Sequence, residues 1–296
     1  MDTQAPHWQQ LIIQSGLIRS EAWILACHVS KHDYAYLRSH DDEPVESSVV
    51  NYFVALSEQR LKGVPIAYLV DEREFYGRSF FVDERVLIPR HETEQLIEIV
   101  LRLLKQDHKA AMPLSLLDLG TGSGIIPITL GLEMKGQLSC IGVDISAEAL
   151  AVAQLNQTRL QNQNTSPLDC QWLQSNWFDA LGSLTPTTRP NTLFDAITSN
   201  PPYIAASDPH LQQGDLRFEP RHALSDEIDG LAAYRTITSQ ASNYLKPGAY
   251  LVFEHGYEQA QNIHDLFKLY PHWQNIQTEQ DLSGLDRCTY AQYAPE

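Results

Sequence analysis

The stretch Leu114-Ser115-Leu116-Leu117-Asp118-Leu119-Gly120-Thr121-Gly122-Ser123-Gly124 decides the fold of this 296-residue chain. It begins with a mostly apolar run of strand length, and glycines then occupy every second position. Glycine lets the backbone turn sharply and approach a ligand closely, and the helix predicted after Gly124 would favour a negative group at its N-terminus. The G-x-G-x-G spacing departs from the G-x-G-x-x-G fingerprint of dinucleotide binding, which weakens the case for NAD. A tight turn with a purely structural role is the alternative.

Strand-like and helix-like segments alternate around this stretch. We predict strands at residues 114–119, 138–143, 168–173, 194–199 and 249–253, and two final strands near 273–278 and 287–293. We predict helices at 92–105, from about 125, at 147–159 behind Ser146, at 231–245 and at 257–269, with a turn at Lys246-Pro247-Gly248. This alternation predicts an α/β domain with a mainly parallel sheet. The last two strands, joined by a loop with Gly284, would form an antiparallel edge pair.

The first part of the chain has a different pattern. Residues 8–62 indicate helices, with Ser20 as an N-cap, Ser48 opening a second helix that Gly63 ends, and one apolar face on that helix. The residues expected on this face are Val50, Phe53, Val54 and Leu61. Short β segments are expected at Tyr68-Leu69-Val70, Phe75-Tyr76 and Phe80-Phe81-Val82, with a turn at Gly77. The chain is therefore divided into a helical domain (1–75), a hairpin linker (76–90) and an α/β domain (91–296).

Composition limits the classes of function. The formal net charge is −16 and there is no dense Lys/Arg run, so broad nucleic-acid binding is disfavoured. The four cysteines are far apart and form no metal-type pair; Cys140, in a strand-like run, is expected in the core. The separated cysteines favour a reduced, cytoplasmic setting. We expect no signal peptide, because the N-terminus lacks a basic segment followed by an apolar stretch, and no membrane span, because no apolar run is long enough.

Polar and aromatic residues follow the next two predicted strands. Asp144 comes about twenty residues after Gly124, where its carboxylate would lie beside the glycine loop and could bind two ribose hydroxyls. Ser175-Asn176-Trp177 follows the third strand, and the Trp177 ring could cover an adenine face. The simpler interpretations are that Asp144 is a helix cap, a role Ser146 could also fill, and that Trp177 is a core residue.

The fourth strand ends in Asn200-Pro201-Pro202-Tyr203. Two prolines cannot continue a strand, so the backbone leaves the sheet with a pre-set shape. That shape brings together the Asn200 side-chain oxygen and the Pro201 carbonyl, which can accept both hydrogens of a planar –NH2 group, and the Tyr203 ring, which can stack on it. Such a site suits chemistry on an amide or amino nitrogen. An ordinary turn after a strand is the alternative.

At this point the residues resemble a known family. Asp118–Gly124 together with Asn200–Tyr203 resembles the S-adenosylmethionine-dependent methyltransferases that act on exocyclic or amide nitrogen. Residues 88–94, Ile-Pro-Arg-His-Glu-Thr-Glu, and 74–76, Glu-Phe-Tyr, are similar to the protein-(glutamine-N5) methyltransferases. The segment 208–220, Asp-Pro-His-Leu-Gln-Gln-Gly-Asp-Leu-Arg-Phe-Glu-Pro, is similar to the branch that modifies peptide chain release factors. The resemblance covers essentially the whole chain.

This resemblance implies a Rossmann-like methyltransferase domain with a seven-stranded sheet, S-adenosylmethionine as methyl donor and S-adenosylhomocysteine as product. We expect no metal, because the sequence has no Cys/His ligand cluster. The resemblance implies methylation of the glutamine in the Gly-Gly-Gln motif of release factors 1 and 2. For the cofactor, it implies that Asp144 binds the ribose, that Trp177 lies near the adenine, that Asn200 borders the cofactor, and that the methionine part is held by Gly120, Thr121, Gly122, Ser123 and Gly124. For the substrate, it implies that Asn200 and Pro201 hold the glutamine amide, and that Pro202 and Tyr203 pack against it.

Two positions depart from the family pattern. His91 stands where the family usually has proline, which puts the shape of that loop in question. Asn176 stands where the family often has Asp, so a contact with the adenine amino group would lack the charge. Neither position belongs to the Asn-Pro-Pro-Tyr turn. No general base is evident: His210 and His222 are neighbours to consider, but a histidine in a loop is more often only solvated.

Three rival functions stay open at this point. A DNA adenine-N6 methyltransferase would use the same turn but would carry a basic DNA-binding surface, which the net charge of −16 opposes. Methylation of a ribosomal protein is opposed by the segment 208–220, and a catalytically silent binding protein by the intact turn and glycine loop. Because every cofactor element follows residue 115, the helical domain is expected to recognise the protein substrate, without direct contact to nucleic acid or membrane.

Overall fold

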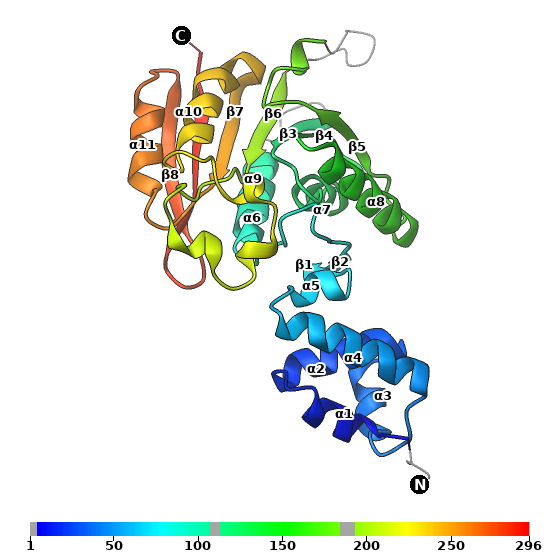
Figure 1. Cartoon of the computed structure of the whole chain (residues 1–296). Coiled ribbons are helices and arrows are strands. Elements are labelled where there is room, and N and C mark those ends of the chain that lie inside the picture. The colour runs from blue at the N-terminus through cyan, green and yellow to red at the C-terminus, as the bar shows by residue number, and fades with distance from the viewer. Residues whose placement is uncertain (1–4, 107–112, 184–192, 296) are drawn as a thin grey trace. The chain divides into compact units, whose positions relative to one another are not determined.

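The computed structural model describes residues 5–106, 113–183 and 193–295. The described chain forms two compact units. Unit 1 comprises Met1–Glu72 and Gln212–Phe218, and unit 2 comprises Arg73–Leu211 and Glu219–Glu296. Figure 1 shows the course of the chain, and each unit is described by itself below.

Unit 1 is helical. Its helices are α1 (Trp8–Gln14), α2 (Arg19–Ser30), α3 (Tyr34–Ser39), α4 (Ser47–Leu61) and α5 (Ile66–Leu69). They bury one apolar cluster, in which Trp8 meets Phe53 edge to face with ring centroids 5.8 Å apart. Burial of such a cluster supplies the apolar contacts that short helices need to be stable.

Residues Gln212–Phe218 belong to unit 1 through polar contacts. The Arg60 guanidinium lies between the carboxylates of Glu21 and Asp215, at 2.8 and 3.0 Å. The Arg217 guanidinium donates to the Lys62 carbonyl at 3.3 Å. Gly63, beside this guanidinium, has φ 99°, a backbone conformation that favours glycine.

Several expectations for this part of the chain are wrong in detail. Tyr68 and Leu69 lie in α5 and not in a strand, because the chain after Pro65 closes helical hydrogen bonds back to the Pro65 and Ile66 carbonyls. Helix α2 begins at Arg19 with Ile18 at its N-cap, so Ser20 is not the cap. On α4, Phe53 is buried, but Val54 and Leu61 are exposed.

Unit 2 is built on a seven-stranded sheet with strand order β5-β4-β3-β6-β7-β9-β8. The strands are β3 (Leu114–Leu119), β4 (Leu138–Asp144), β5 (Asp169–Gln174), β6 (Phe194–Ser199), β7 (Leu245–Glu254), β8 (Trp273–Gln280) and β9 (Asp286–Tyr293). The first five in this order are parallel, and β9 and β8 complete the edge as an antiparallel pair. The predicted α/β class and antiparallel edge are confirmed.

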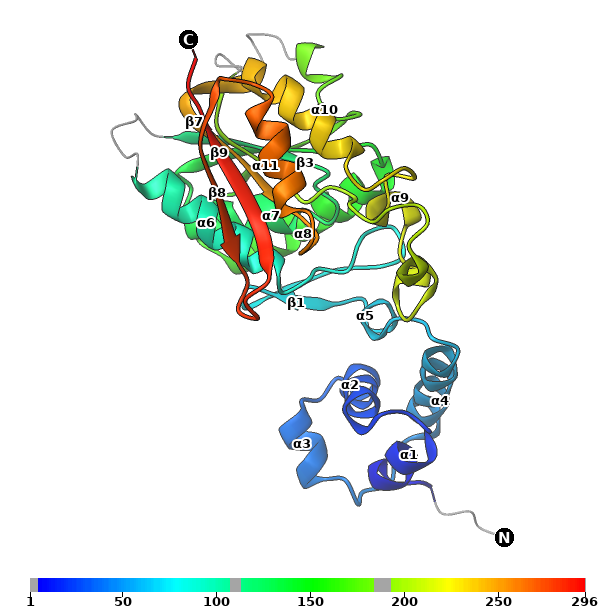
Figure 2. The same cartoon turned by 90° about the vertical axis from the view of Figure 1, so that its left-hand side faces the viewer.

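Helices cover both faces of this sheet. The helices are α6 (Thr93–Gln106), α7 (Ile125–Glu133), α8 (Ala147–Gln163), α9 (Arg221–Leu224), α10 (Ala232–Gln240) and α11 (Ala260–Lys268). Helices α6, α7 and α8 contribute to one apolar cluster, and α10 and α11 contribute to a second. The result is a three-layer arrangement, seen from two sides in Figures 1 and 2.

The hairpin before α6 is confirmed as β1 (Arg73–Phe75) and β2 (Arg78–Phe80), antiparallel, with Gly77 at φ 69° in the turn. Its Phe75 and Phe80 side chains are fully buried in the core of unit 2. The turn expected at Lys246-Pro247-Gly248 lies instead inside β7, where the pairing with β6 shifts register after Phe194. Helix α10 ends at Gln240, and a 3-10 turn over Ala241–Tyr244 replaces its expected last turn.

Cys140 is buried in the core as predicted, and all four cysteines are free thiols. In the described ranges no helix is both long and apolar enough to cross a membrane.

Candidate functional site

The glycine loop connects β3 to α7 in a conformation that only glycine adopts readily. Gly120, Gly122 and Gly124 have φ angles of 74°, 54° and 80°. A Cβ on Gly122 would meet nothing within 4 Å, so this position faces open space. A Cβ on Gly124 would lie 3.0 Å from both Ala153 and Trp172, so Gly124 serves helix packing. The loop therefore combines an open cradle at Gly122 with a packing glycine.

Asp144, the last residue of β4, lies beside this loop. Its Oδ2 accepts a hydrogen bond from the Gly122 N–H at 2.9 Å, and its Oδ1 accepts one from the Ser146 N–H at 2.9 Å. Ser146 caps α8, because its hydroxyl accepts from the Ala149 N–H. The cap role is thus filled by Ser146, and Asp144 lies at the edge of the open space.

Trp177, after β5, lies on the other side of the loop. The position of a Cβ on Gly120 would be 3.8 Å from the Trp177 ring. Trp177 has φ 48°, a left-handed conformation that costs on the order of 1 kcal/mol or more for a residue with a side chain. The strained backbone places the indole beside the cradle and not in the middle of the core.

These residues line one cavity of about 370 Å³ in unit 2. Of the predicted residues, Gly120, Gly122, Asp144, Trp177, Asn200 and Pro202 line it. Another part of the wall carries no recognisable sequence motif and is formed by Arg85, Val86, Leu87, Ser225, Asp226, Ala232, Ala233 and Thr236. Thr121, Ser123 and Pro201 are buried, and neither they nor Gly124 and Tyr203 are in the cavity wall.

Two polar side chains are buried next to the loop. Asp118 Oδ1 accepts a hydrogen bond from the Thr198 hydroxyl at 2.8 Å, and the Thr121 hydroxyl faces the Asp118 carboxyl. Burial raises the pKa of Asp118 to about 6, against the Thr121 and Thr198 hydrogen bonds that lower it. Asp118 and Thr121 are not in the cavity wall, so they support the loop from within the protein. The open cradle at Gly122 fits an amino acid-like group of a cofactor.

The Asn200-Pro201-Pro202-Tyr203 turn follows β6 at the same edge of the sheet. Ser199, the last residue of β6, pairs in register with Leu119 of β3 and Phe253 of β7. Asn200 Nδ2 donates to the Thr93 hydroxyl at 3.3 Å, which leaves Oδ1 for another partner. Burial raises the pKa of the Tyr203 phenol to about 12, so it stays protonated at neutral pH.

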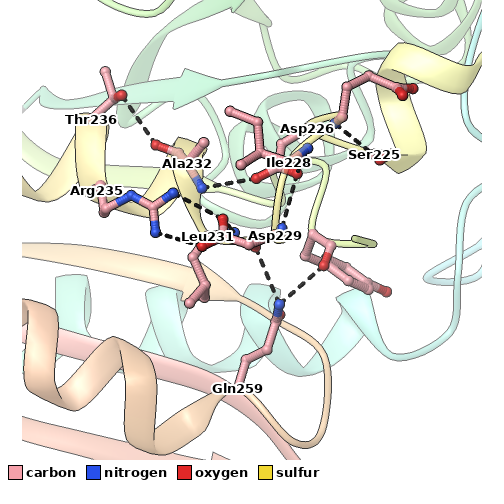
Figure 3. A network of polar contacts seen from close by, with 12 residues as sticks. Ser225, Asp226, Ile228, Asp229, Leu231, Ala232, Arg235, Thr236 and Gln259 are labelled. Carbon is pink, nitrogen blue, oxygen red and sulfur yellow. Dashed lines mark hydrogen bonds and ion pairs between the residues drawn. The ribbon is translucent and has the colours of Figure 1, made fainter. Parts of the chain in front are cut away.

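Gln259 holds the Asn-Pro-Pro-Tyr turn through a hydrogen bond to its backbone. Its amide donates to the Tyr203 carbonyl at 3.0 Å and to the Gly230 carbonyl at 3.2 Å, and its Oε1 accepts from the Gly256 N–H. Asp226, in the cavity wall, accepts from the backbone N–H groups of Ile228, Gly230 and Ala232, all at 2.9 Å. Figure 3 shows this network, in which one carboxylate and one amide fix the segment facing the turn.

The two histidines considered as bases differ in position. His222 lines the cavity. His210 is exposed and its ring contacts the Asp208 carboxylate at 2.7 Å. Within the described residues no group of three or more His, Cys, Asp or Glu side chains could hold a metal ion.

A parallel sheet whose glycine loop, carboxylate and Asn-Pro-Pro-Tyr turn meet at one cavity defines a Rossmann-like methyltransferase. The comparison with family models agrees: residues 111–290 match a methyltransferase domain, and residues 9–70 match the PrmC N-terminal domain. The chain belongs to the family of release factor glutamine methyltransferases.

The family assignment rests on similarity over nearly the full length. A release factor glutamine methyltransferase of Bordetella pertussis is 40% identical over 95% of this chain and 97% of its own length. Those of Vibrio cholerae and Pasteurella multocida are each 39% identical, over 93% and 92% of this chain and 90% of their own lengths. Identity at this level across both units confirms the resemblance drawn from the motifs.

Proposed function

We propose that this chain transfers a methyl group from S-adenosylmethionine to the side-chain amide N5 of the glutamine in the Gly-Gly-Gln motif of peptide chain release factors 1 and 2. The relatives are named for glutamine methylation of release factors. The observation that carries the proposal is the Asn200 side chain, whose amide nitrogen is bound to Thr93 so that its oxygen is left for a donor in the cavity. Release factors act in the bacterial cytoplasm, which would be the site of action.

The cofactor would lie along the loop and the Asp144 carboxylate. The open cradle at Gly122, which lines the cavity, supports binding of its methionine part. The Asp144 carboxylate would accept from the ribose hydroxyls, and the Trp177 ring would cover the adenine. When bound, the cofactor supplies a methyl group on a sulfonium, which is a good leaving group.

The chain's own contribution would be orientation and electrostatics. An amide nitrogen is a poor nucleophile because its lone pair is delocalised into the carbonyl. Two acceptors, Asn200 Oδ1 and the Pro201 carbonyl, would hold both N–H bonds and stabilise the positive charge that nitrogen gains as the C–N bond forms. The Tyr203 ring would stack on the amide and limit it to the plane needed for in-line attack.

We propose further that the helical part of the chain, about residues 1–75, selects the protein substrate. All residues proposed for the cofactor lie in unit 2. A tripeptide motif offers little contact area compared with a stable protein interface, so a second surface on the release factor would supply the rest. An acidic enzyme would suit a partner whose nucleic-acid-facing surface is basic.

The experiment uses the purified chain with methyl-labelled S-adenosylmethionine. Its substrates are intact release factor, the same factor with the Gly-Gly-Gln glutamine changed to alanine, and double-stranded DNA. We expect label only on the intact factor, and peptide mass spectrometry should place one added methyl group on that glutamine. Label on DNA, or equal label on the altered factor, would contradict the proposal.

A further inference from the structure

A buried carboxylate lies behind the Asn-Pro-Pro-Tyr turn and has no role so far. Glu254 is the last residue of β7, directly after Phe253, which pairs with the residue before Asn200. It is 1% exposed. The Thr93 hydroxyl and the Asn200 amide face it and favour its charged form, yet its Oε2 makes no regular hydrogen bond in the described structure.

A buried carboxyl group at the end of β7 lowers the stability of the folded protein, so its presence calls for a functional reason. Burial raises the pKa of Glu254 to about 7, while Thr93 and the positive charge of Arg287 lower it. A Leu or Met at the end of β7 would avoid that cost. Desolvated carboxyl groups of this kind are concentrated at functional sites.

The direction of the hydrogen bonds shows what the carboxylate can do. Thr93 has one hydroxyl proton, and an ionised carboxylate can only accept. When that proton points to Glu254, the Thr93 oxygen is free to accept from Asn200 Nδ2, which is the contact seen at 3.3 Å. If the hydroxyl pointed to Asn200 instead, the Asn200 amide would turn over and present –NH2 to the substrate –NH2.

We propose that Glu254 is a positioning residue for the methyl transfer: its carboxylate orients the Thr93 hydroxyl and faces the Asn200 amide, and together with Thr93 it holds Asn200 with Oδ1 toward the substrate amide. This inference rests on the proposed function. Glu254 touches neither substrate nor cofactor in this scheme. It acts through two side chains from other elements, Thr93 at the start of α6 and Asn200 after β6.

The scheme makes turnover depend on the charge of Glu254. The titratable groups around it are Glu92 next to α6, Tyr203 after β6, Tyr234 of α10, and Arg287 and Cys288 of β9. Burial raises the pKa of the Tyr234 phenol and of the Cys288 thiol, so both are neutral around pH 7. The change of charge near pH 7 is therefore assigned to Glu254.

The test compares kcat and KM for release factor between pH 6 and 9 in the unchanged enzyme and in Glu254→Gln, Thr93→Val and Thr93→Ser. We expect kcat of the unchanged enzyme to rise through about pH 7. Glu254→Gln and Thr93→Val should each lower kcat by about tenfold to a hundredfold, flatten this rise and leave the cofactor KM unchanged. Thr93→Ser should behave like the unchanged enzyme, and the double variant should be no slower than the slower single variant.

A matched control is Glu279→Gln, which removes a carboxylate of β8 paired with Arg102. It should leave kcat and its pH dependence as they are. A normal kcat and pH profile in Glu254→Gln would overturn the inference. It would also be overturned if the fold-loss of kcat in the double variant equalled the product of the losses in Glu254→Gln and Thr93→Val. These results presuppose an active unchanged enzyme, whose activity tests the proposed function separately.

A second measurement needs no turnover. In 15N-labelled protein, the Asn200 side-chain amide signals, assigned by their loss in Asn200→Ala, should shift as pH passes about 7. They should not shift in Glu254→Gln. If these signals do not respond to pH in the unchanged protein, Glu254 does not control Asn200, whatever substrate the enzyme accepts.

Discussion

Replacement of Glu254 by glutamine should stabilise unit 2, and more so at high pH. The pKa of Glu254 is raised from 4.5 to about 7 in the folded protein. Between these two pH values the folded state binds the proton more tightly than the unfolded state, so the free energy of unfolding falls as pH rises through this window. Above about pH 7 the full penalty is present. At ~1.4 kcal/mol for each pH unit, it amounts to about 3 kcal/mol.

Glutamine has nearly the shape of the protonated glutamic acid and cannot ionise. The free energy of unfolding of Glu254→Gln should therefore equal that of the unchanged protein at acidic pH and exceed it at alkaline pH. With the two pKa values above, the gain in unfolding free energy should be about 1 kcal/mol at pH 5.5 and about 3 kcal/mol at pH 8. Contributions from other groups, such as Asp118, are common to both proteins and cancel in the difference.

Urea unfolding at both pH values, followed by circular dichroism, measures this difference. If the two units unfold separately, the transition of unit 1 is the internal control, because Glu254 lies in unit 2. The midpoint of unit 2 should move while the slope with urea stays constant. A gain that is equal at both pH values, or a loss of stability, would refute the idea that a desolvated carboxyl is kept at the end of β7.

Four further results are expected. Asp144→Ala should weaken S-adenosylmethionine binding by about 1–3 kcal/mol in calorimetry, because hydrogen bonds to a charged group are lost. Asn200→Ala should lower kcat by about a hundredfold or more in steady-state assays, with little change in cofactor affinity, since an acceptor matters most as charge develops. A short Gly-Gly-Gln peptide should be methylated far less efficiently than the intact release factor, and equal efficiency would exclude a substrate role for the helical unit. Gly230→Ala should destabilise unit 2 by more than about 1 kcal/mol in urea unfolding, because a Cβ there would lie 2.2 Å from the Tyr203 carbonyl oxygen.

The strands that lead into the site could be predicted closely from the sequence. Strands β3 and β6 begin and end as expected, at Leu114–Leu119 and Phe194–Ser199. Each is an apolar run that stops at residues which cannot continue a buried strand, glycines in one case and two prolines in the other. Since parallel strands place their carboxyl ends at one edge, the meeting of the glycine loop, Asp144 and Asn200 followed from the order of elements.

Short apolar runs without such boundaries were misinterpreted. Residues Tyr68-Leu69-Val70 have strand-like side chains, but three residues cannot distinguish a strand from one helical turn, and the turn after Pro65 decides. Similarly, Lys246-Pro247-Gly248 has the composition of a turn, yet these residues lie within β7, at the point where its pairing with β6 shifts register. In both cases tertiary context overrides local preference.

The second layer of the site was not predictable in the same way. Thr93, Asp226 and Glu254 are single polar residues at the ends of otherwise apolar or turn-like segments. Their role depends on which other elements pack against them, and no spacing rule joins Thr93 to Glu254 across more than 150 residues. The only signal is a polar residue next to a strand that is predicted to be buried, and that pattern is common to many proteins.

Three features that destabilise the folded state of unit 2 lie at the edge of the sheet where the reaction would occur. Asp118 near the end of β3 and Glu254 at the end of β7 each bury a carboxyl group, and Trp177 after β5 has a left-handed backbone. Each feature opposes folding, and apolar or glycine residues would remove each cost. Their common position at the carboxyl ends of strands is therefore best explained by the proposed reaction: Trp177 would place a flat ring beside the loop, and Glu254 would hold an asparagine whose oxygen faces a poor nucleophile. In the proposed mechanism, rigid orientation of that one side chain would take the place of a strong base.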